Sequence, residues 1–98
     1  MIVYNVSIQI DEEVKEDWLK WMKEKHIPDV MKTGLFIRFN FLKIINEEAE
    51  HTYAIQYFCK NMSILNRYFD EFASGLQEEH SSRYKNKFVA FRTIMEEV

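Results

Sequence analysis

The sequence has few of the residues that cross-link a chain or interrupt secondary structure: one cysteine, one proline and two glycines among 98 residues. A single cysteine cannot form an internal disulfide, and such cysteine usage fits a reducing, cytoplasmic compartment. No apolar run approaches the roughly 20 residues that a membrane-spanning helix needs. The first ten residues also lack a basic leader and a small-residue cleavage site, so we expect no signal peptide.

An excess of positive charge is also missing, because the formal net charge is −3 and the acidic and basic residues are interspersed. Nucleic acids and anionic membranes are bound by basic patches, so we expect neither as a partner. The residues that are abundant are apolar, at 47%, and aromatic, at 15%. This composition excludes a disordered chain, and the length predicts a single domain spanning residues 1–98.

The spacing of apolar residues predicts six elements. Alternation with a period of two predicts strands over 1–10, 35–45, 52–59 and 86–95. Helical spacing predicts helices over 11–25 and 63–84, with Asp11 as the first N-cap and Asn61 or Ser63 as the second. A polar stretch, 46–51, connects the second and third strands. The order is that of an α+β, ferredoxin-like βαββαβ domain, a four-stranded antiparallel sheet with two helices on one face.

Two helices can cover only one face of such a sheet. We expect the more apolar set of alternating positions on the covered face: Ile2, Tyr4, Val6, Ile8, Ile37, Phe39, Tyr53, Ile55, Val89 and Phe91. The open face should then carry Val3, Asn5, Ser7, Gln9, Phe36, Arg38, Asn40, Leu42, Ala54, Gln56, Phe58, Phe88, Ala90 and Arg92. A face with three phenylalanines among polar side chains is expected where a second sheet packs and encloses a cavity.

Four segments, "MIVYNVSIQIDEEV", "WLKWMKEKHIPDVMKTGLF", "TYAIQYF" and "KFVAFRT", resemble a family of short bacterial proteins known only as a domain of unknown function. The resemblance extends over nearly the whole chain. In architecture the chain resembles the dimeric α/β-barrel superfamily, in which two ferredoxin-like protomers pair sheet to sheet. The resemblance implies this fold and a homodimer. It implies no particular function, because the superfamily contains several kinds of enzyme as well as members without known activity.

Polar side chains on the predicted open face are the main candidates for a binding site. Two arginines among amides and a hydroxyl can hold a carboxylate or phosphate through paired hydrogen bonds. The same residues also suit a hydrated dimer interface, in which the arginines pair with acids or carbonyls of the partner. Both interpretations stay open for this set: Asn5, Ser7, Arg38, Asn40, Gln56 and Arg92.

The stretch "HIPD" holds a further candidate, His26. Pro28 has no N–H to donate, so it should kink the helix or start a new turn, and it should bias Ile27 away from helical geometry. Gly34 is a natural helix stop. We favour a local role, in which Asp29 caps the new turn and His26 satisfies the broken backbone. The alternative is that His26 is a general base or ligand at the mouth of the barrel.

The remaining reactive residues give no motif. The three histidines lie on different elements without an i,i+4 pair, so the spacing predicts no metal site, and no cofactor-binding motif is present. Cys59 should be a buried, inert thiol. We expect His51 to be solvated, His80 to lie on a helix face, and Trp18 and Trp21 to anchor the core or an interface.

The sequence therefore predicts a small dimeric protein that binds or transforms a small, anionic molecule between its helices and the open sheet face. Each buried polar group without a partner would cost roughly 1–3 kcal/mol in a dry interface, and a wet cavity avoids that cost. The alternative is a structural or interaction homodimer without catalytic activity. Whether the protein is an enzyme is left open, because no set of residues specifies a reaction.

Overall fold

Four strands and two long helical segments make up the computed structural model, which describes residues 1–46 and 48–98. Glu47, in the predicted connection 46–51, lies outside the described residues. The strands are β1 (Ile2–Ile10), β2 (Arg38–Lys43), β3 (Thr52–Cys59) and β4 (Phe88–Glu96). The first helical segment contains a 3₁₀ turn (Glu12–Val14), α1 (Lys15–Trp21), a π-helical turn (Met22–His26) and α2 (Ile27–Met31). The second contains α3 (Met62–Tyr68), a π-helical turn (Phe69–Ala73) and α4 (Ser74–Arg83).

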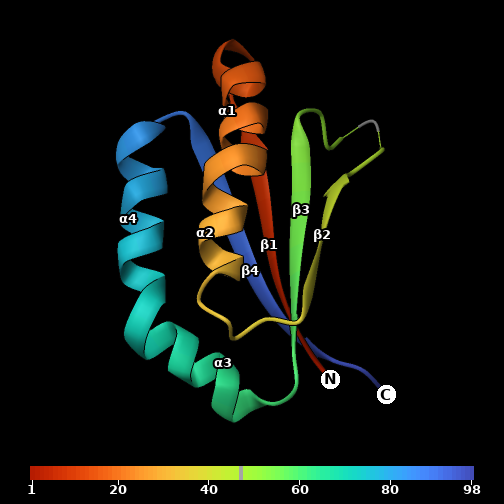
Figure 1. The fold of residues 1–98 in the computed structure, drawn as a ribbon. Helices are drawn as coiled ribbons and strands as arrows, with labels where there is room; N and C mark the ends of the chain where they lie inside the picture. Colours follow the sequence, from red (N-terminus) through yellow and green to blue (C-terminus); the bar gives the residue numbers. More distant parts are fainter. Residues whose placement is uncertain (47) are drawn as a thin grey trace.

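The strands form one antiparallel sheet with the order β2-β3-β1-β4. Both helical segments pack on the same face of this sheet, and the opposite face carries no element (Figure 1). The predicted ferredoxin-like βαββαβ fold is therefore confirmed. No helix in the described residues is long and apolar enough to cross a lipid bilayer.

The predicted helix starts and stop are also found. The Asp11 side chain accepts a hydrogen bond from the Glu13 N–H at 2.9 Å, and Asn61 accepts one from the Ile64 N–H at 3.0 Å. These bonds satisfy backbone donors that have no partner within the first turn of a helix. Gly34 follows the first segment with a φ of +78°, a conformation that glycine adopts without steric cost.

The helix passes Pro28 differently from the prediction. Ile27 has helical angles, φ −61° and ψ −45°, and its N–H bonds to the Met22 carbonyl, five residues back. This wider π-helical turn brings the chain to the proline without breaking the helix, so the predicted bias of Ile27 is wrong. The Asp29 carboxylate forms an ion pair with Lys25 and does not cap the turn.

The β1 and β3 registers place their apolar residues toward the helices, as predicted. Tyr4 lies opposite Tyr57, Val6 opposite Ile55 and Ile8 opposite Tyr53. Residues directly opposite one another share a face of the sheet. The helices complete this core with side chains that are at most 1% exposed: Trp18, Met22, Ile27, Val30 and Leu65.

Strand β4 is turned over relative to the prediction. Val6 lies opposite Arg92, and Ile10 lies opposite Phe88. Phe88, Ala90 and Arg92 therefore face the helices, whereas Val89 and Phe91 lie on the open face. The alternation in β4 was predicted correctly. A period of two does not tell which of the two alternating sets faces the helices, and the wrong choice places every side chain of the strand on the opposite face.

Phe36 also departs from the prediction, because the chain bends at Ile37, just before β2 begins. The bend inserts the Phe36 ring into the core, 5.2 Å from the Tyr57 ring and 4.9 Å from the Tyr68 ring between centroids. Phe58 does lie on the open face, where the Arg38 guanidinium sits 3.6 Å above its ring centroid.

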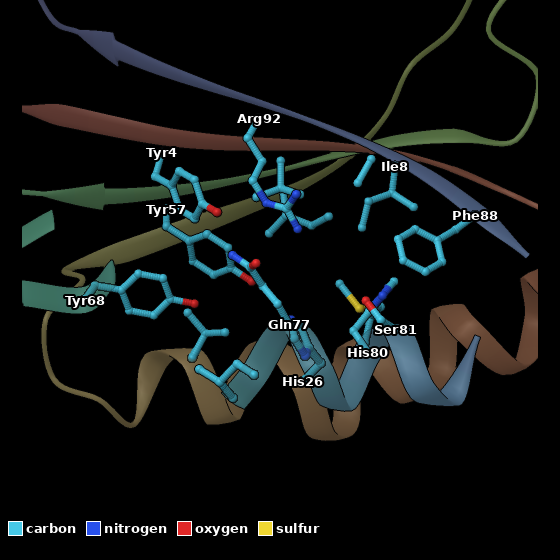
Figure 2. Close-up of a pocket in the computed structure, with 16 residues that line it drawn as sticks. Tyr4, Ile8, His26, Tyr57, Tyr68, Gln77, His80, Ser81, Phe88 and Arg92 are labelled. Atoms are coloured by element: carbon cyan, nitrogen blue, oxygen red, sulfur yellow. The ribbon is translucent and has the colours of Figure 1, made fainter. Parts of the chain in front are cut away.

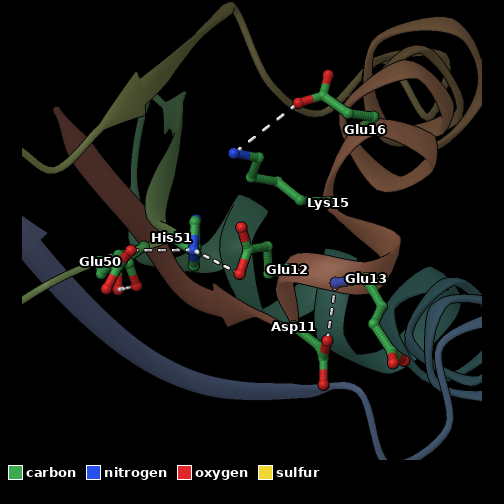
Figure 3. A network of polar contacts seen from close by, with 8 residues as sticks. Asp11, Glu12, Glu13, Lys15, Glu16, Glu50 and His51 are labelled. Atoms are coloured by element: carbon green, nitrogen blue, oxygen red, sulfur yellow. Dashed lines mark hydrogen bonds and ion pairs between the residues drawn. The ribbon is translucent and has the colours of Figure 1, made fainter.

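His51 was predicted to be solvated, but it is half-buried and contacts neighbouring segments. Its backbone has a φ of +57°, and its carbonyl accepts a hydrogen bond from the Ile10 N–H at 2.9 Å. The half-buried imidazole lies 3.3 Å from a Glu50 oxygen and 4.0 Å from a Glu12 oxygen (Figure 3). His51 therefore joins the β2–β3 connection to the start of the first helical segment.

Candidate ligand pocket

A pocket lies between the helical layer and the covered face of the sheet, toward β4 (Figure 2). Its volume, measured as the space open to the centre of a water molecule, is about 40 Å³. That is room for more than one water or for a small organic molecule. The walls are mostly apolar, with aliphatic and aromatic side chains from both layers, among them Val6, Ile8, Val30, Ile55, Leu76 and Phe88.

Five polar side chains from five different elements meet at one end of this pocket. They are Tyr4 on β1, Tyr57 on β3, Tyr68 on α3, Gln77 on α4 and Arg92 on β4. Figure 2 shows the hydroxyl groups, the amide and the guanidinium pointing toward a common space. Arg92 belongs to the edge strand and is exposed, so this end of the pocket borders solvent.

The tyrosines are hydrogen-bond donors at neutral pH. Burial raises the pKa of Tyr4, and nearby Arg92 and Gln77 act in the opposite direction. Burial, with the neighbouring tyrosines adding to it, also raises the pKa of Tyr57 and Tyr68 well above the usual range. All three hydroxyls therefore keep their protons beside the Arg92 cation.

Two histidines form the wall at the helical side of the pocket. Burial lowers the pKa of His26 and of His80 to about 4, so both imidazoles are neutral at pH 7. His80 Nε2 accepts a hydrogen bond from Trp18 Nε1 at 2.9 Å, and the His26 ring stacks on Trp21 with 5.1 Å between centroids. The two imidazole centroids are 5.6 Å apart.

The favoured interpretation requires the His26 side chain to hydrogen-bond backbone groups left free at Pro28, and its Nδ1 forms no such bond. This nitrogen is buried and has no hydrogen-bond partner, the sole such side-chain atom among residues 1–46 and 48–98. The ring lines the pocket instead. Its role in binding or proton transfer stays a prediction.

The six predicted open-face residues do not come together in one site. Arg92 lines the pocket on the covered face, with His26. The other five lie on the open face, where most of their polar groups are already paired within the sheet. Asn5 Nδ2 donates to Ser7 Oγ at 3.1 Å, Asn40 Nδ2 donates to Gln56 Oε1 at 3.3 Å, and Arg38 lies over Phe58.

The pocket thus lies between the helices and the covered face of the sheet, not at the open face where the sequence placed the candidate residues, and a binding site on the open face stays a prediction. Sequence reasoning missed Tyr4, Tyr57, Tyr68, Gln77 and His80. The sequence did contain one signal. A tyrosine hydroxyl on a buried apolar face needs a polar neighbour, and the sequence had placed Tyr4 on that face and Tyr57 in the strand 52–59.

The described residues bring no three His, Cys, Asp or Glu side chains together at metal-binding distances. The prediction that no metal or cofactor binds stays a prediction. Cys59 is fully buried on the covered face, as expected, and burial raises the pKa of its thiol. A protonated, enclosed thiol is a poor nucleophile.

Comparison with known proteins assigns the chain to a family. The whole chain, residues 1–98, matches the model of a domain of unknown function (DUF4286), and the protein belongs to that family. This agrees with the resemblance seen in the sequence. Among curated proteins, none matches the sequence.

Solved structures with the same fold cover nearly the whole chain. HapK from Hahella chejuensis has a TM-score of 0.73 and 11% identity, covering 100% of this chain and 93% of that one. A dimeric ferredoxin-like protein from an uncultured marine organism has a TM-score of 0.70 and 13% identity, covering 99% and 97%. SnoaB, a cofactor-independent oxygenase from Streptomyces nogalater, has a TM-score of 0.70 and 8% identity, covering 98% and 92%. At such low identities the likeness concerns the fold.

Proposed function

We propose that this protein is a homodimer that binds a small carboxylate in the pocket between its helices and sheet. The observation that carries the proposal is the position of Arg92. Its guanidinium faces three protonated tyrosines, and no ion pair within the described residues involves it. The tyrosine oxygens and the Gln77 carbonyl can accept from this cation, but none of them is charged, whereas a carboxylate supplies two charged oxygens to a guanidinium.

The size and wall of the pocket restrict the ligand further. A pocket of this size fits a carboxylate with a short carbon chain. The apolar wall, which includes Val6 and Ile8, suits that chain, and the carboxylate end meets Arg92 near solvent. Apolar walls with a few convergent polar groups are typical of small-molecule sites. The similar fold of a cofactor-independent oxygenase is in keeping with such a use.

The homodimer is proposed from the open face. Large apolar side chains remain exposed there: Leu42 at 46%, Val89 at 51%, Phe91 at 68% and Met95 at 39%. They lie on strands β2 and β4, on either side of the internally paired polar groups. An apolar patch of this kind on a sheet typically meets a second sheet. A structural neighbour is itself a dimeric ferredoxin-like protein.

A purely structural homodimer is the second candidate, and the open face is what favours it. Asn5 with Ser7, and Asn40 with Gln56, already satisfy one another within one protomer. These residues therefore suit an interface better than a ligand site. This candidate leaves the donor-rich pocket around Arg92 without a use, so we prefer the binding protein.

The ligand proposal is tested by thermal unfolding with acetate and propionate, against the neutral isosteres acetamide and propionamide. A ligand at ten times its Kd stabilises the native state by about 1.4 kcal/mol. For a domain of this size, that raises Tm by roughly 5–10 °C. We expect the carboxylates to raise Tm and the amides to leave it unchanged.

Two arginine variants locate the site. Arg92→Met keeps the apolar stem and removes the charge, and it should abolish the carboxylate effect. Arg67→Met is the matched control, because the exposed side chain of Arg67 on α3 lies outside the pocket and pairs with Glu71. Equal shifts from acetate and acetamide, or a full carboxylate effect in Arg92→Met, would refute the proposed site.

Light scattering at micromolar concentration tests the dimer separately. We expect twice the mass of one chain. A single-chain mass would remove the dimer and leave the ligand proposal standing, because every residue of the pocket comes from one protomer.

A further inference from the structure

His80 is held in one protonation form by its neighbour. The ring is 5% exposed, and its Nε2 lies 2.9 Å from Nε1 of the fully buried Trp18. An indole nitrogen can only donate, so Nε2 of His80 must be the unprotonated, accepting nitrogen. A neutral imidazole with a free lone pair on Nε2 carries its hydrogen on Nδ1.

The hydrogen on Nδ1 is available to the pocket. His80 is one of the residues that line it, from the helical side (Figure 2). In the described residues, the buried polar side-chain atom without a partner is His26 Nδ1 and not His80 Nδ1. No hydrogen bond to His80 Nδ1 is found among the described residues, and because the atom is also not one of the enclosed unpartnered ones, part of its surface is accessible. On a ring that lines the pocket, this uncharged N–H is a donor for a ligand.

Arg92 and His80 act on the same space. Burial, together with His26 and the Arg92 charge, lowers the pKa of His80 and keeps it neutral. Arg92 comes from the sheet and His80 from α4, so the pocket has a cationic donor on one wall and a neutral donor on the other. A ligand that satisfies both must offer a carboxylate and a second oxygen acceptor.

We propose that His80 determines specificity by donating Nδ1–H to a carbonyl oxygen of the ligand, with Trp18 as the residue that positions it. The ligand class is then the small 2-oxo acids. This inference rests on the proposed function, because it places the carboxylate of the ligand at Arg92.

The chemistry at the second carbon of the acid decides the selectivity. A ketone oxygen accepts from Nδ1–H, whereas a methylene group leaves that donor without a partner inside the pocket. An ammonium group is itself a charged donor, so it faces the Nδ1–H of His80 with no acceptor between them. We expect the site to reject it most strongly. Sites built to hydrogen-bond a substrate group discriminate well against analogues that lack it.

Calorimetric titration with pyruvate, propionate and alanine measures this selectivity on one three-carbon skeleton. We expect pyruvate to bind at least about tenfold more tightly than propionate, and alanine to show no binding. Equal affinities for pyruvate and propionate would overturn the role of His80 and leave the carboxylate proposal intact. Absence of binding by all three acids would overturn both.

Variants separate the two walls of the pocket. His80→Phe removes the donor and keeps a ring, so pyruvate affinity should fall to that of propionate, while propionate still binds. Arg92→Met should weaken both acids. Retention of the pyruvate preference in His80→Phe would refute the assignment.

The tautomer of His80 can be tested in the wild-type protein, so this test does not depend on the folding of a variant. Nitrogen–proton correlation spectra of ¹⁵N-labelled protein at pH 7 distinguish the two neutral tautomers of each histidine. We expect His80 to be the Nδ1–H form, and pyruvate to perturb that nitrogen more than propionate does. An Nε2–H tautomer would overturn the inference. Trp18→Phe should release the ring into a mixture of tautomers and reduce the preference for pyruvate.

Discussion

The two faces of the sheet use polar residues in opposite ways. On the open face, polar side chains bond to their nearest neighbours, as Asn40 does with Gln56 across strands β2 and β3. On the covered face, Tyr4, Tyr57 and Arg92 point away from the sheet into a space shared with the helices. Polar residues on a sheet are therefore available to a ligand only where a second layer faces them across a gap.

The apolar residues show the reverse arrangement. At the centre of the covered face they are enclosed, with Tyr4 at 3% and Ile55 at 1% exposed, whereas Phe39 and Ile94 on the edge strands of that face remain exposed. On the open face Phe91 remains 68% exposed. The covered face thus contributes folding stability and a pocket, whereas the open face leaves apolar side chains exposed, where we propose the dimer interface.

Trp18→Ala gives the largest expected effect on this contrast. The substitution leaves a cavity in the core and removes the donor to His80, so the free energy of unfolding should fall by about 3–5 kcal/mol. Phe91→Ala, on the open face, should change the unfolding of the isolated protomer by less than about 0.5 kcal/mol. Urea denaturation measures both, and similar losses in the two variants would mean that the faces do not differ as described.

Acid should destabilise the covered face specifically. His80 has a pKa of about 4 in the folded protein and roughly 6.5 when unfolded. The unfolded state binds more protons between these values, so stability is fully present above pH 6.5 and is lost as the pH falls toward 4. The loss is at most about 3 kcal/mol for His80, and His26 adds to it in the same direction.

Urea denaturation at several pH values between 7 and 4 checks this expectation. His80→Phe and His26→Phe should each make the pH dependence shallower. Gln56→Leu, on the open face, should leave its slope unchanged. A wild-type protein whose stability is constant from pH 6.5 to 4.5 would show that these imidazoles are not held neutral by burial.

An acidic residue placed at one of two β4 positions on opposite faces, Phe88 or Phe91, tests which way this strand faces. Phe88 packs edge-on against His80, with 4.5 Å between ring centroids, whereas Phe91 faces outward. Phe88→Asp should lower the free energy of unfolding by about 2 kcal/mol or more. Phe91→Asp should instead raise the dimer Kd more than about tenfold, or about 1.4 kcal/mol.

Light scattering and urea denaturation on both variants separate these effects. If the results are exchanged, with Phe91→Asp unfolding the protomer and Phe88→Asp dissociating the dimer, the register of β4 is wrong.

The smallest effect concerns the helix start that holds α3 over the covered face. Asn61→Ala removes the cap on the Ile64 N–H and should cost about 1 kcal/mol. Ser63→Ala, at the other position that the sequence allowed as a cap, should cost less than about 0.5 kcal/mol. Thermal unfolding of the two variants side by side compares them, and a larger loss for Ser63→Ala would contradict the assigned cap.

Most of the fold could be predicted because it depends on local patterns. Alternation in 1–10 and 52–59 and the helical spacing around Trp18 follow from which residues avoid water. Asp11 and Gly34 act through the backbone beside them, so their roles are legible without the rest of the chain. The wider π-helical turn before Pro28 was not predicted, because a propensity rule does not anticipate how neighbouring turns rearrange around a proline.

The candidate site could be predicted only in part. Arg92 and His26 were selected for their chemistry, and both line the pocket, but Arg92 was assigned to the wrong face. Both sets of alternating residues in β4 are partly apolar, so hydrophobicity alone did not decide which set turns inward. His80 was missed because its partner, Trp18, lies 62 positions away in the chain.

By itself, the sequence determined the order of the elements, the first helix start at Asp11 and the presence of one sheet with one helix-covered face. These features follow from short-range periodicity and backbone chemistry. Only the tertiary structure decided which side of β4 faces the helices, that Phe36 turns into the core, and that Tyr4, His80 and Arg92 share a pocket. Those outcomes depend on how strands pair and on which distant side chains fill the same space, and no local pattern in the chain encodes that pairing.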